Sequence, residues 1–473
     1  MTSMDAEVVV IGSGAGGATS AAVLAGAGKQ VLVLEEGPEL TLGAVEPFSL
    51  EELRQAYRHH GSSATLGLPP IAYAEGRCVG GSTEVNSGLW NRLPETIRAR
   101  WEAQRRLPDF GAGELDRHAA WVEGVLGVST LPDGLPPSSQ VLEDGAAALG
   151  WRHEEFARVY RYDDRGRGTK QTMTRTMLPR ATAAGAEVLS GCRVRRVQLD
   201  GDRALGVEAT VGEGPDAAPV TLRAEQVVVC GGAIQTPALL QRSGLRRGIG
   251  PGLRVHPTVK VVARMPERLD HDDVPMERIT EFAPSIAIGG SASRRGHIGM
   301  ALADAGVPVG PLLDDWDHRF VYYASIRSDR AGRVRALPGW QAPLVTYPLT
   351  DGDLSRLARG LVHLGEALLA AGATELHASI TGAPVAHGPH DLAGWWDALD
   401  RRRANLMTVH LTSSVHMSGD RSLGGVDGHG RVWGTENLWV SDASILPEAP
   451  GVNPQATIMT LAARNAEHLV ATR

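Results

Sequence analysis

The sequence contains few cysteines and no cluster of cysteine and histidine. Three cysteines, Cys78, Cys192 and Cys230, occur in 473 residues, and no CxxC pair or Cys/His cluster accompanies them. They do not suggest a disulfide framework, and the sequence predicts no metal site. A reducing cytoplasm is the expected location. The first predicted strand begins within ten residues of Met1, so we expect no signal peptide.

Long apolar runs and an excess of positive charge are also missing. No uncharged apolar run is long enough to cross a membrane, so we expect no membrane partner. A net charge of −7 and a pI near 6.2 argue against a general nucleic-acid-binding protein. Lysine occurs only three times, and the abundant arginine is interpreted as the codon bias of a GC-rich genome. The length predicts two domains rather than one.

Glycine, by contrast, is abundant, and the glycines near the N-terminus have a regular spacing. The apolar run Val8 to Ile11 predicts a strand that is buried on both faces. Gly12, Gly14 and Gly17 then follow with the spacing of a dinucleotide fingerprint. The first glycine permits a tight turn, the second lets a pyrophosphate approach the backbone, and the third lets helix and strand pack closely. This stretch therefore predicts the phosphate-binding turn of a nucleotide site.

The residues after the turn complete a strand–helix–strand unit. Ala18 to Ala27 predicts a helix, whose N-terminus beside Ala15 offers free N–H groups to phosphate. A second strand, Val31 to Leu34, ends at Glu35, an acid placed to reach ribose hydroxyls. FAD and NAD both place an ADP moiety in such a unit, so the fingerprint alone leaves both cofactors open.

A second glycine-rich stretch covers residues 74 to 94. Gly80, Gly81 and Ser82 form a loop whose backbone N–H groups can face a ligand, and Asn86 can place an amide beside it. Taken alone, the stretch is equally typical of a glycine-rich hairpin.

Together with the fingerprint, this stretch resembles the first signature of the glucose–methanol–choline (GMC) oxidoreductases, GRxxGGSxxxN. The matching residues are Gly76, Arg77, Gly80, Gly81, Ser82 and Asn86. A second family signature is matched by Gly232, Ala233, Thr236, Pro237, Leu239, Leu240, Ser243 and Gly244. The resemblance implies an FAD site that includes Arg77 and Gly232. It also implies that Val194 contacts adenine through its backbone.

The resemblance further implies that FAD is held non-covalently. Some members attach FAD through a histidine immediately before the signature asparagine, and Val85 stands there in this sequence. His256, which lies in a family-like His-Pro turn, is interpreted as structural.

Two C-terminal segments resemble the catalytic part of the family. In Thr408 to Gly419, His410 stands at the position of the catalytic histidine and is favoured over His416. Asp442 and Ala443 form a turn expected near the flavin phosphate or ribityl chain. Asn453 then precedes Pro454 and a helix that begins at Gln455. Asn453 could simply cap that helix, but the family places a histidine or asparagine here, opposite the catalytic histidine.

This set of residues suits the oxidation of an alcohol to an aldehyde or ketone. A neutral His410 can accept the hydroxyl proton, and Asn453 can donate a hydrogen bond to the developing alkoxide. Hydride would pass to flavin N5, and the N-terminus of the helix at Gln455 would hold the resulting negative charge. Three alternatives stay open: an NAD-dependent dehydrogenase, a GMC-fold lyase with non-redox FAD, and a non-catalytic flavin-binding protein.

The resemblance implies an α/β fold. A Rossmann-like FAD-binding domain of the GMC and p-hydroxybenzoate-hydroxylase type would combine with an α+β substrate domain built on an antiparallel sheet. We expect the FAD-binding domain to be discontinuous, over residues 1–95, 180–258 and 405–473. Residues 96–179 and 259–404 would form the substrate-binding or cap domain.

The substrate is expected to be a small-molecule alcohol. A sugar or aminosugar hydroxyl in the biosynthesis of a secondary metabolite is one hypothesis, and the acidic balance would suit a cationic substrate. The sequence leaves open whether O₂ or another carrier accepts the electrons.

Overall fold

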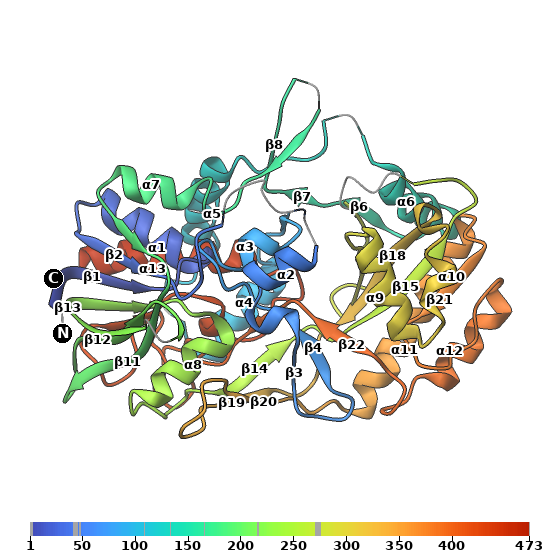
Figure 1. Cartoon of the computed structure of the whole chain (residues 1–473). Coiled ribbons are helices and arrows are strands. Elements are labelled where there is room, and N and C mark those ends of the chain that lie inside the picture. Colours follow the sequence, from blue (N-terminus) through green and yellow to red (C-terminus); the bar gives the residue numbers. More distant parts are fainter. Residues whose placement is uncertain are drawn as a thin grey trace.

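Two large sheets lie at opposite ends of the molecule (Figure 1). The computed structural model describes residues 3–40, 46, 49–107, 109–132, 134–164, 166–214, 217–269 and 276–472. Both chain termini lie at the end that contains the seven-stranded sheet (Figure 1). The nine-stranded sheet forms the other end.

The seven-stranded sheet is built around β1, whose valines Val8, Val9 and Val10 are fully buried. The strand order is β10-β2-β1-β13-β12-β11, and β24 pairs with β13. β1, β2, β10, β13 and β24 are parallel, while β12 pairs antiparallel with β11 and β13. The strands are β1 (Ser3–Ile11), β2 (Val31–Leu34), β10 (Glu187–Leu189), β11 (Cys192–Asp200), β12 (Arg203–Val211), β13 (Ala218–Val229) and β24 (Leu438–Val440).

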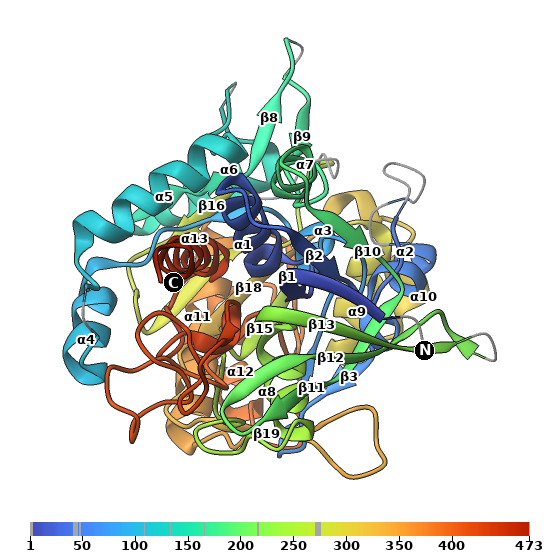
Figure 2. The same ribbon diagram turned by 90° about the vertical axis from the view of Figure 1, so that its left-hand side faces the viewer.

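Helices cover both faces of this sheet because its parallel strands are apolar on both sides. One face packs against α1 (Ala15–Gly26), α5 (Ala112–Leu126), α7 (Met177–Ala183) and α13 (Gln455–Ala471), which lie together above the sheet in Figure 2. The other face packs against α4 (Glu95–Arg105) and α8 (Gly232–Arg242). The β1–α1–β2 unit confirms the Rossmann-like part of the predicted fold.

The nine-stranded sheet has the order β3-β4-β22-β15-β18-β17-β16-β6, with β21 paired to β15. Its pairs are antiparallel except β4 with β22. It contains β3 (Ser63–Ala64), β4 (Ile71–Tyr73), β6 (His153–Glu155), β15 (Thr258–Arg264), β16 (Glu277–Ile279), β17 (Ile286–Gly290), β18 (Arg319–Ile326), β21 (Glu375–Ala378) and β22 (Leu406–Thr408). This arrangement confirms the expected α+β domain on an antiparallel sheet.

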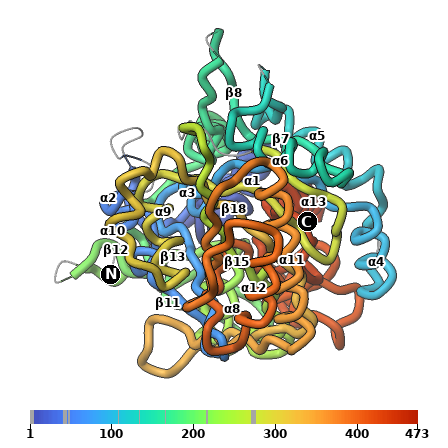
Figure 3. Tube along the Cα trace, turned by 90° about the vertical axis from the view of Figure 1, so that its right-hand side faces the viewer, coloured from blue at the N-terminus to red at the C-terminus, as the bar shows by residue number. Residues whose placement is uncertain are grey.

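Helices also sandwich the second sheet, as seen in Figure 3. α11 starts with a full capping box, in which the Thr350 side chain accepts from the backbone of Asp353 while Asp353 accepts from the Thr350 N–H. α6 and α11 pack on one face, and α9 packs on the other. The helices at this end are α6 (Pro137–Leu149), α9 (Arg295–Ala305), α10 (Val309–Leu312), α11 (Asp351–Ala370) and α12 (Ala393–Ala398).

A four-stranded sheet joins the two ends through the order β20-β19-β14-β23. Its strands are β14 (Pro251–Val255), β19 (Gly332–Arg335), β20 (Leu344–Thr346) and β23 (Leu411–Thr412). The chain therefore leaves the nine-stranded sheet at β22 and enters this sheet at β23 within three residues. The remaining elements include α2 (Leu50–Ala56), α3 (Ser82–Val85), and the pairs β5 (Leu89–Trp90) with β7 (Ala157–Arg158) and β8 (Tyr160–Tyr162) with β9 (Gly168–Lys170).

The sheets differ from the proposed domain boundaries at several elements. β3, β4 and β22 belong to the nine-stranded sheet, although they fall within segments predicted for the FAD-binding domain. α4 and α5 pack on the seven-stranded sheet, although all of α5 and all of α4 after Glu95 fall within 96–179. We therefore keep the boundaries as a proposal and suggest these reassignments. Among the described residues, no helix is both long enough and apolar enough to cross a membrane.

Candidate active site

The two glycine-rich stretches meet at the N-terminus of α1. The Gly80 N–H donates to the Ser13 hydroxyl at 3.0 Å, and that hydroxyl donates to the Glu35 carboxylate at 2.7 Å. Gly14 and Gly81 face each other so closely that a Cβ on Gly81 would lie 2.9 Å from the Cα of Gly14. Only glycine fits this contact, because Gly81 also has a φ of +57°.

Glu35 is buried at the end of β2 and is held by backbone donors. Its carboxylate accepts from the Ser13 N–H at 3.0 Å and from the Gly37 N–H at 2.8 Å. Burial raises the pKa of Glu35, while these hydrogen bonds act in the opposite direction. The acid predicted to bind ribose is thus fixed next to the glycine turn.

Two contacts bring the C-terminal segments to the same place. Asp442 accepts from the Gly232 N–H at 2.8 Å, which joins the end of β24 to the start of α8. The Asn86 amide donates to the Gln455 side chain at 2.6 Å, which joins the first signature to α13. Five separate stretches of the sequence therefore surround one site. They contribute Gly12, Gly14, Ala15 and Gly17; Gly80, Gly81, Ser82 and Asn86; Gly232; Asp442 and Ala443; and Pro454 and Gln455.

Two predicted cofactor residues have other partners in the structure. The Arg77 guanidinium donates to Glu36 at 3.2 Å, and Glu36 directly follows Glu35. Val194 lies on β11 opposite Ala209 and packs against the core of the seven-stranded sheet. Contact of either residue with the cofactor stays a prediction.

The residues present fit an FAD. Pyrophosphate needs a backbone surface free of side chains, which Gly12, Gly14 and Gly81 provide. It also needs unsatisfied N–H groups, and in the described structure no side chain caps α1 at Gly14 or α13 at Pro454. The alternative in which Asn453 simply caps α13 does not apply, because its side-chain amide contacts Asn91 and His410 instead.

His410 and Asn453 lie side by side where the two ends of the molecule meet. His410 stands between β22 and β23, and Asn453 precedes α13. The His410 Nε2 lies 3.3 Å from the Asn453 Nδ2, and the Asn453 Oδ1 accepts from the Asn91 Nδ2 at 3.0 Å. Burial lowers the pKa of His410 to about 4, so its imidazole is neutral at pH 7. A neutral imidazole beside an amide donor can accept a proton from a hydroxyl group.

The competing histidine is turned toward a different partner. The His416 Nδ1 donates to the Ser413 carbonyl at 3.1 Å. The geometry thus favours His410 over His416 as the partner of Asn453.

Sequence reasoning missed two residues of this site. Asn91, which orients Asn453, lies five positions after Asn86, so its place near the signature was the available signal. His256 was interpreted as structural, yet its Nδ1 lies 2.9 Å from the His410 Nδ1, and the two rings meet edge to face. The two histidines are 154 residues apart, and the sequence held no signal that they touch.

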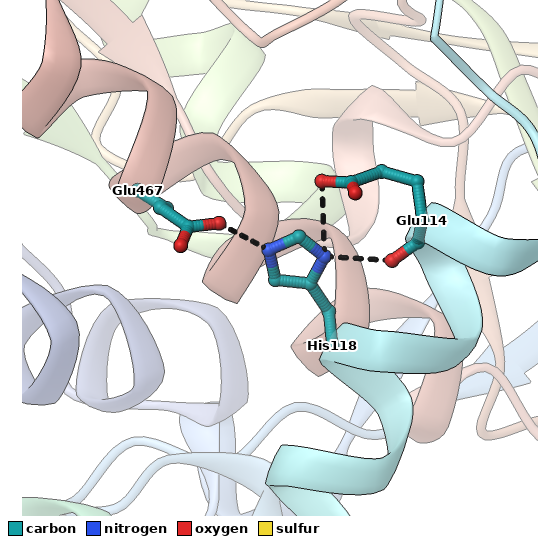
Figure 4. A group of neighbouring side chains, drawn as sticks. All are labelled: Glu114, His118 and Glu467. Atoms are coloured by element: carbon teal, nitrogen blue, oxygen red, sulfur yellow. Dashed lines mark hydrogen bonds and ion pairs between the residues drawn. The ribbon is translucent and has the colours of Figure 1, made fainter.

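A second group of titratable side chains links α5 to α13 (Figure 4). The His118 Nε2 lies 2.8 Å from the Glu467 carboxylate, and the His118 Nδ1 donates to the Glu114 carbonyl at 2.9 Å. These residues have the types and spacing of metal ligands. The Arg117 guanidinium already contacts both Glu467 and Glu114, and the cluster is best described as an ion-pair network between helices.

Comparison with known proteins agrees with the fold. Family models described as GMC oxidoreductase match residues 53–258 and 328–462, and a model of an NAD(P)-binding Rossmann-like domain matches residues 10–60. An uncharacterised GMC-type oxidoreductase of Sinorhizobium fredii is 40% identical and covers 98% of this chain and 94% of its own length.

More distant matches extend the comparison. A long-chain-alcohol oxidase of Arabidopsis thaliana is 28% identical over 96% of this chain and 66% of its own length. The crystal structure of pyridoxine 4-oxidase from Mesorbium loti superposes with a TM-score of 0.76 at 20% identity, covering 99% of this chain and 100% of that one. The family answers the question that the glycine fingerprint left open, because its cofactor is FAD. On this evidence the chain belongs to the GMC oxidoreductase family and is an FAD-dependent oxidoreductase.

Proposed function

We propose that this enzyme oxidises an alcohol to an aldehyde or ketone, with His410 as the general base. The observation that carries the proposal is the 3.3 Å approach of the Asn453 Nδ2 to the His410 Nε2 beside the residues that would hold FAD. Bound FAD supplies the acceptor for the hydride that leaves the alcohol carbon. The name of the long-chain-alcohol oxidase relative supports the same reaction class.

The side chains of the site divide the proton chemistry between them. His410 takes the hydroxyl proton at Nε2, the atom that faces Asn453. Asn453 donates from Nδ2 to the oxygen as negative charge develops on it. The uncapped N-terminus of α13 presents free N–H groups and the positive end of the helix dipole to negative charge in the same site.

For the substrate and the electron acceptor we propose classes of compound. A sugar or aminosugar hydroxyl, including a cationic one, and a long-chain alcohol are the substrate classes to compare. O₂ and a separate electron carrier are the acceptors to compare. FAD is proposed to be dissociable because Val85 offers no side-chain nucleophile next to Asn86. Acid denaturation should then release all the flavin into the supernatant.

The test is anaerobic titration of the purified, FAD-loaded enzyme with alcohols of these classes while the visible flavin bands are recorded. We expect one class to bleach the bands and admitted air to show whether O₂ restores them. His410→Gln should retain FAD and slow the bleaching by about 10²- to 10⁴-fold, which is the usual contribution of general-base catalysis.

His416→Gln is the matched control, since His416 bonds to the Ser413 carbonyl, and it should reduce the flavin at nearly the wild-type rate. Equal rates for His410→Gln and the wild type would refute the role of His410. If no alcohol bleaches the flavin, the cleavage of cyanohydrin-like substrates becomes the reaction to test.

A further inference from the structure

The two histidines at the centre of the site share one proton. The His256 Nδ1 and the His410 Nδ1 are 2.9 Å apart, a hydrogen-bond distance. Burial lowers the pKa of both rings, so both are neutral at pH 7. Two neutral imidazoles can hold only one proton between these nitrogens, and whichever ring carries it fixes the tautomer of both.

The amides on the other side of His410 decide where that proton lies. Asn91 donates to the Oδ1 of Asn453, which turns the Nδ2 of Asn453 toward the His410 Nε2. If that Nε2 carried a proton, two donors would face each other at 3.3 Å. The His410 Nε2 is therefore a lone-pair acceptor, and the His410 proton must lie on Nδ1 and point at His256.

We propose that His256 is a positioning residue, which accepts the Nδ1 proton of His410 and thereby holds the Nε2 lone pair toward the substrate. Its function in catalysis rests on the proposed alcohol oxidation, whereas the tautomer itself does not. When His410 takes a second proton at Nε2, the same acceptor stabilises the imidazolium that forms, as a carboxylate does in the catalytic triad of serine proteases.

The surroundings of His256 suit an acceptor that stays neutral. The ring is only 5% exposed, and the charged or titratable groups that influence it are His410, from the link between β22 and β23, and Arg327, directly after β18. The positive Arg327 disfavours a second proton on His256. In this tautomer the remaining proton of His256 sits on Nε2, a buried nitrogen with no partner among the described residues. An unpaired buried N–H is costly, and its retention is consistent with a functional constraint on the other nitrogen.

The first test reads the tautomer directly. We would label histidine with ¹⁵N in the FAD-loaded enzyme and assign His410 by comparison with His410→Gln. We expect a pyrrole-type signal for the His410 Nδ1 and a pyridine-type signal for Nε2. The opposite assignment would overturn the proposal. This measurement needs no substrate, so it separates failure of the inference from failure of the proposed function.

The second test compares two variants by anaerobic flavin reduction. His256→Asn keeps an acceptor oxygen near the position of Nδ1, whereas His256→Leu fills similar space without one. We expect the Leu variant to reduce the flavin about 10²-fold more slowly, with the acid limb of its pH profile moved to lower pH because the imidazolium has lost its acceptor. The Asn variant should stay within about tenfold of the wild type.

A Leu variant as fast as the wild type, or equal losses in both variants, would overturn the proposal. Flavin content and thermal melting show whether each variant has folded. If the Leu variant does not fold, the Asn variant and the tautomer assignment still decide the question.

Discussion

Replacing Asn453 by aspartate tests the electrostatics of the site most directly, because the side chain keeps its shape and only the donor is exchanged for charge. A carboxylate oxygen would then lie where the amide nitrogen is now, 3.3 Å from the His410 Nε2. At that distance, with an effective dielectric constant of about 20, the attraction between carboxylate and imidazolium is about 5 kcal/mol.

This attraction opposes the burial that now lowers the pKa of His410 to about 4. At 1.36 kcal/mol per pKa unit, the acid limb of flavin reduction should move from near pH 4 to about pH 7–8. The base would be largely protonated at pH 7, so the variant should be slow there and recover toward pH 9. Its plateau should also be lower by about 10²-fold, since the donor to the alkoxide is lost.

The assay is rapid anaerobic mixing of the FAD-loaded variant with an alcohol that reduces the wild type, across the pH range in which both stay folded. Asn453→Ala is the matched control, because it removes the donor without adding charge and should lower the plateau while leaving the limb in place. An acid limb that stays at its wild-type position in the aspartate variant would refute the assignment of His410 as the titrating base.

Three further outcomes follow from the contacts described above. Gly81→Ala should lose FAD on gel filtration, because the added methyl group would collide with the turn at Gly14. The control Gly124→Ala should keep FAD, because a Cβ at this position of α5 meets nothing within 4 Å; equal flavin retention in the two variants would count against the glycine contact. Burial lowers the pKa of His410 below its unfolded value of 6.5, so its contribution to stability is fully present above pH 6.5 and is lost as the pH falls toward 4; thermal melts at intervals from pH 7 to pH 4 should show this decline, and His410→Gln should make it shallower. Hydrogen bonds from Arg117 lower the pKa of Glu467 to about 2, so Glu467→Gln should lower the melting temperature slightly above about pH 4.5 and leave it unchanged near pH 2. Chelators should leave the melting temperature of the wild type unchanged, since a drop would reveal a structural metal.

The local elements of the flavin end follow from the sequence with little ambiguity. The run of valines before Gly12 predicts a strand buried on both faces, and the glycine spacing after it predicts a tight turn into a helix. The strand predicted at Val31 to Leu34 and the helix predicted to begin at Gln455 correspond to the observed β2 and α13. These patterns are readable because each depends on neighbours a few positions apart.

The strand pairing at the substrate end could not be predicted from the sequence, because it depends on residues that are far apart in the chain. The sequence predicts an antiparallel sheet there, but the sheet also takes in β4 and β22, which come from the two outer parts of the chain. No periodicity in a short strand says which distant strand it will join, because edge pairing is decided by the packing of the whole sheet.

The residue types along the chain set the chemistry available to this protein. They specified a nucleotide-binding turn, a histidine and an asparagine in the C-terminal segments, and a family whose members use FAD. The tertiary structure alone decided which atoms meet: Asn91 against Asn453, and His256 against His410. Residue types limit what a side chain can donate or accept. A hydrogen bond between residues 154 positions apart forms only after the sheets have packed, because packing alone brings the two side chains within 3 Å of each other.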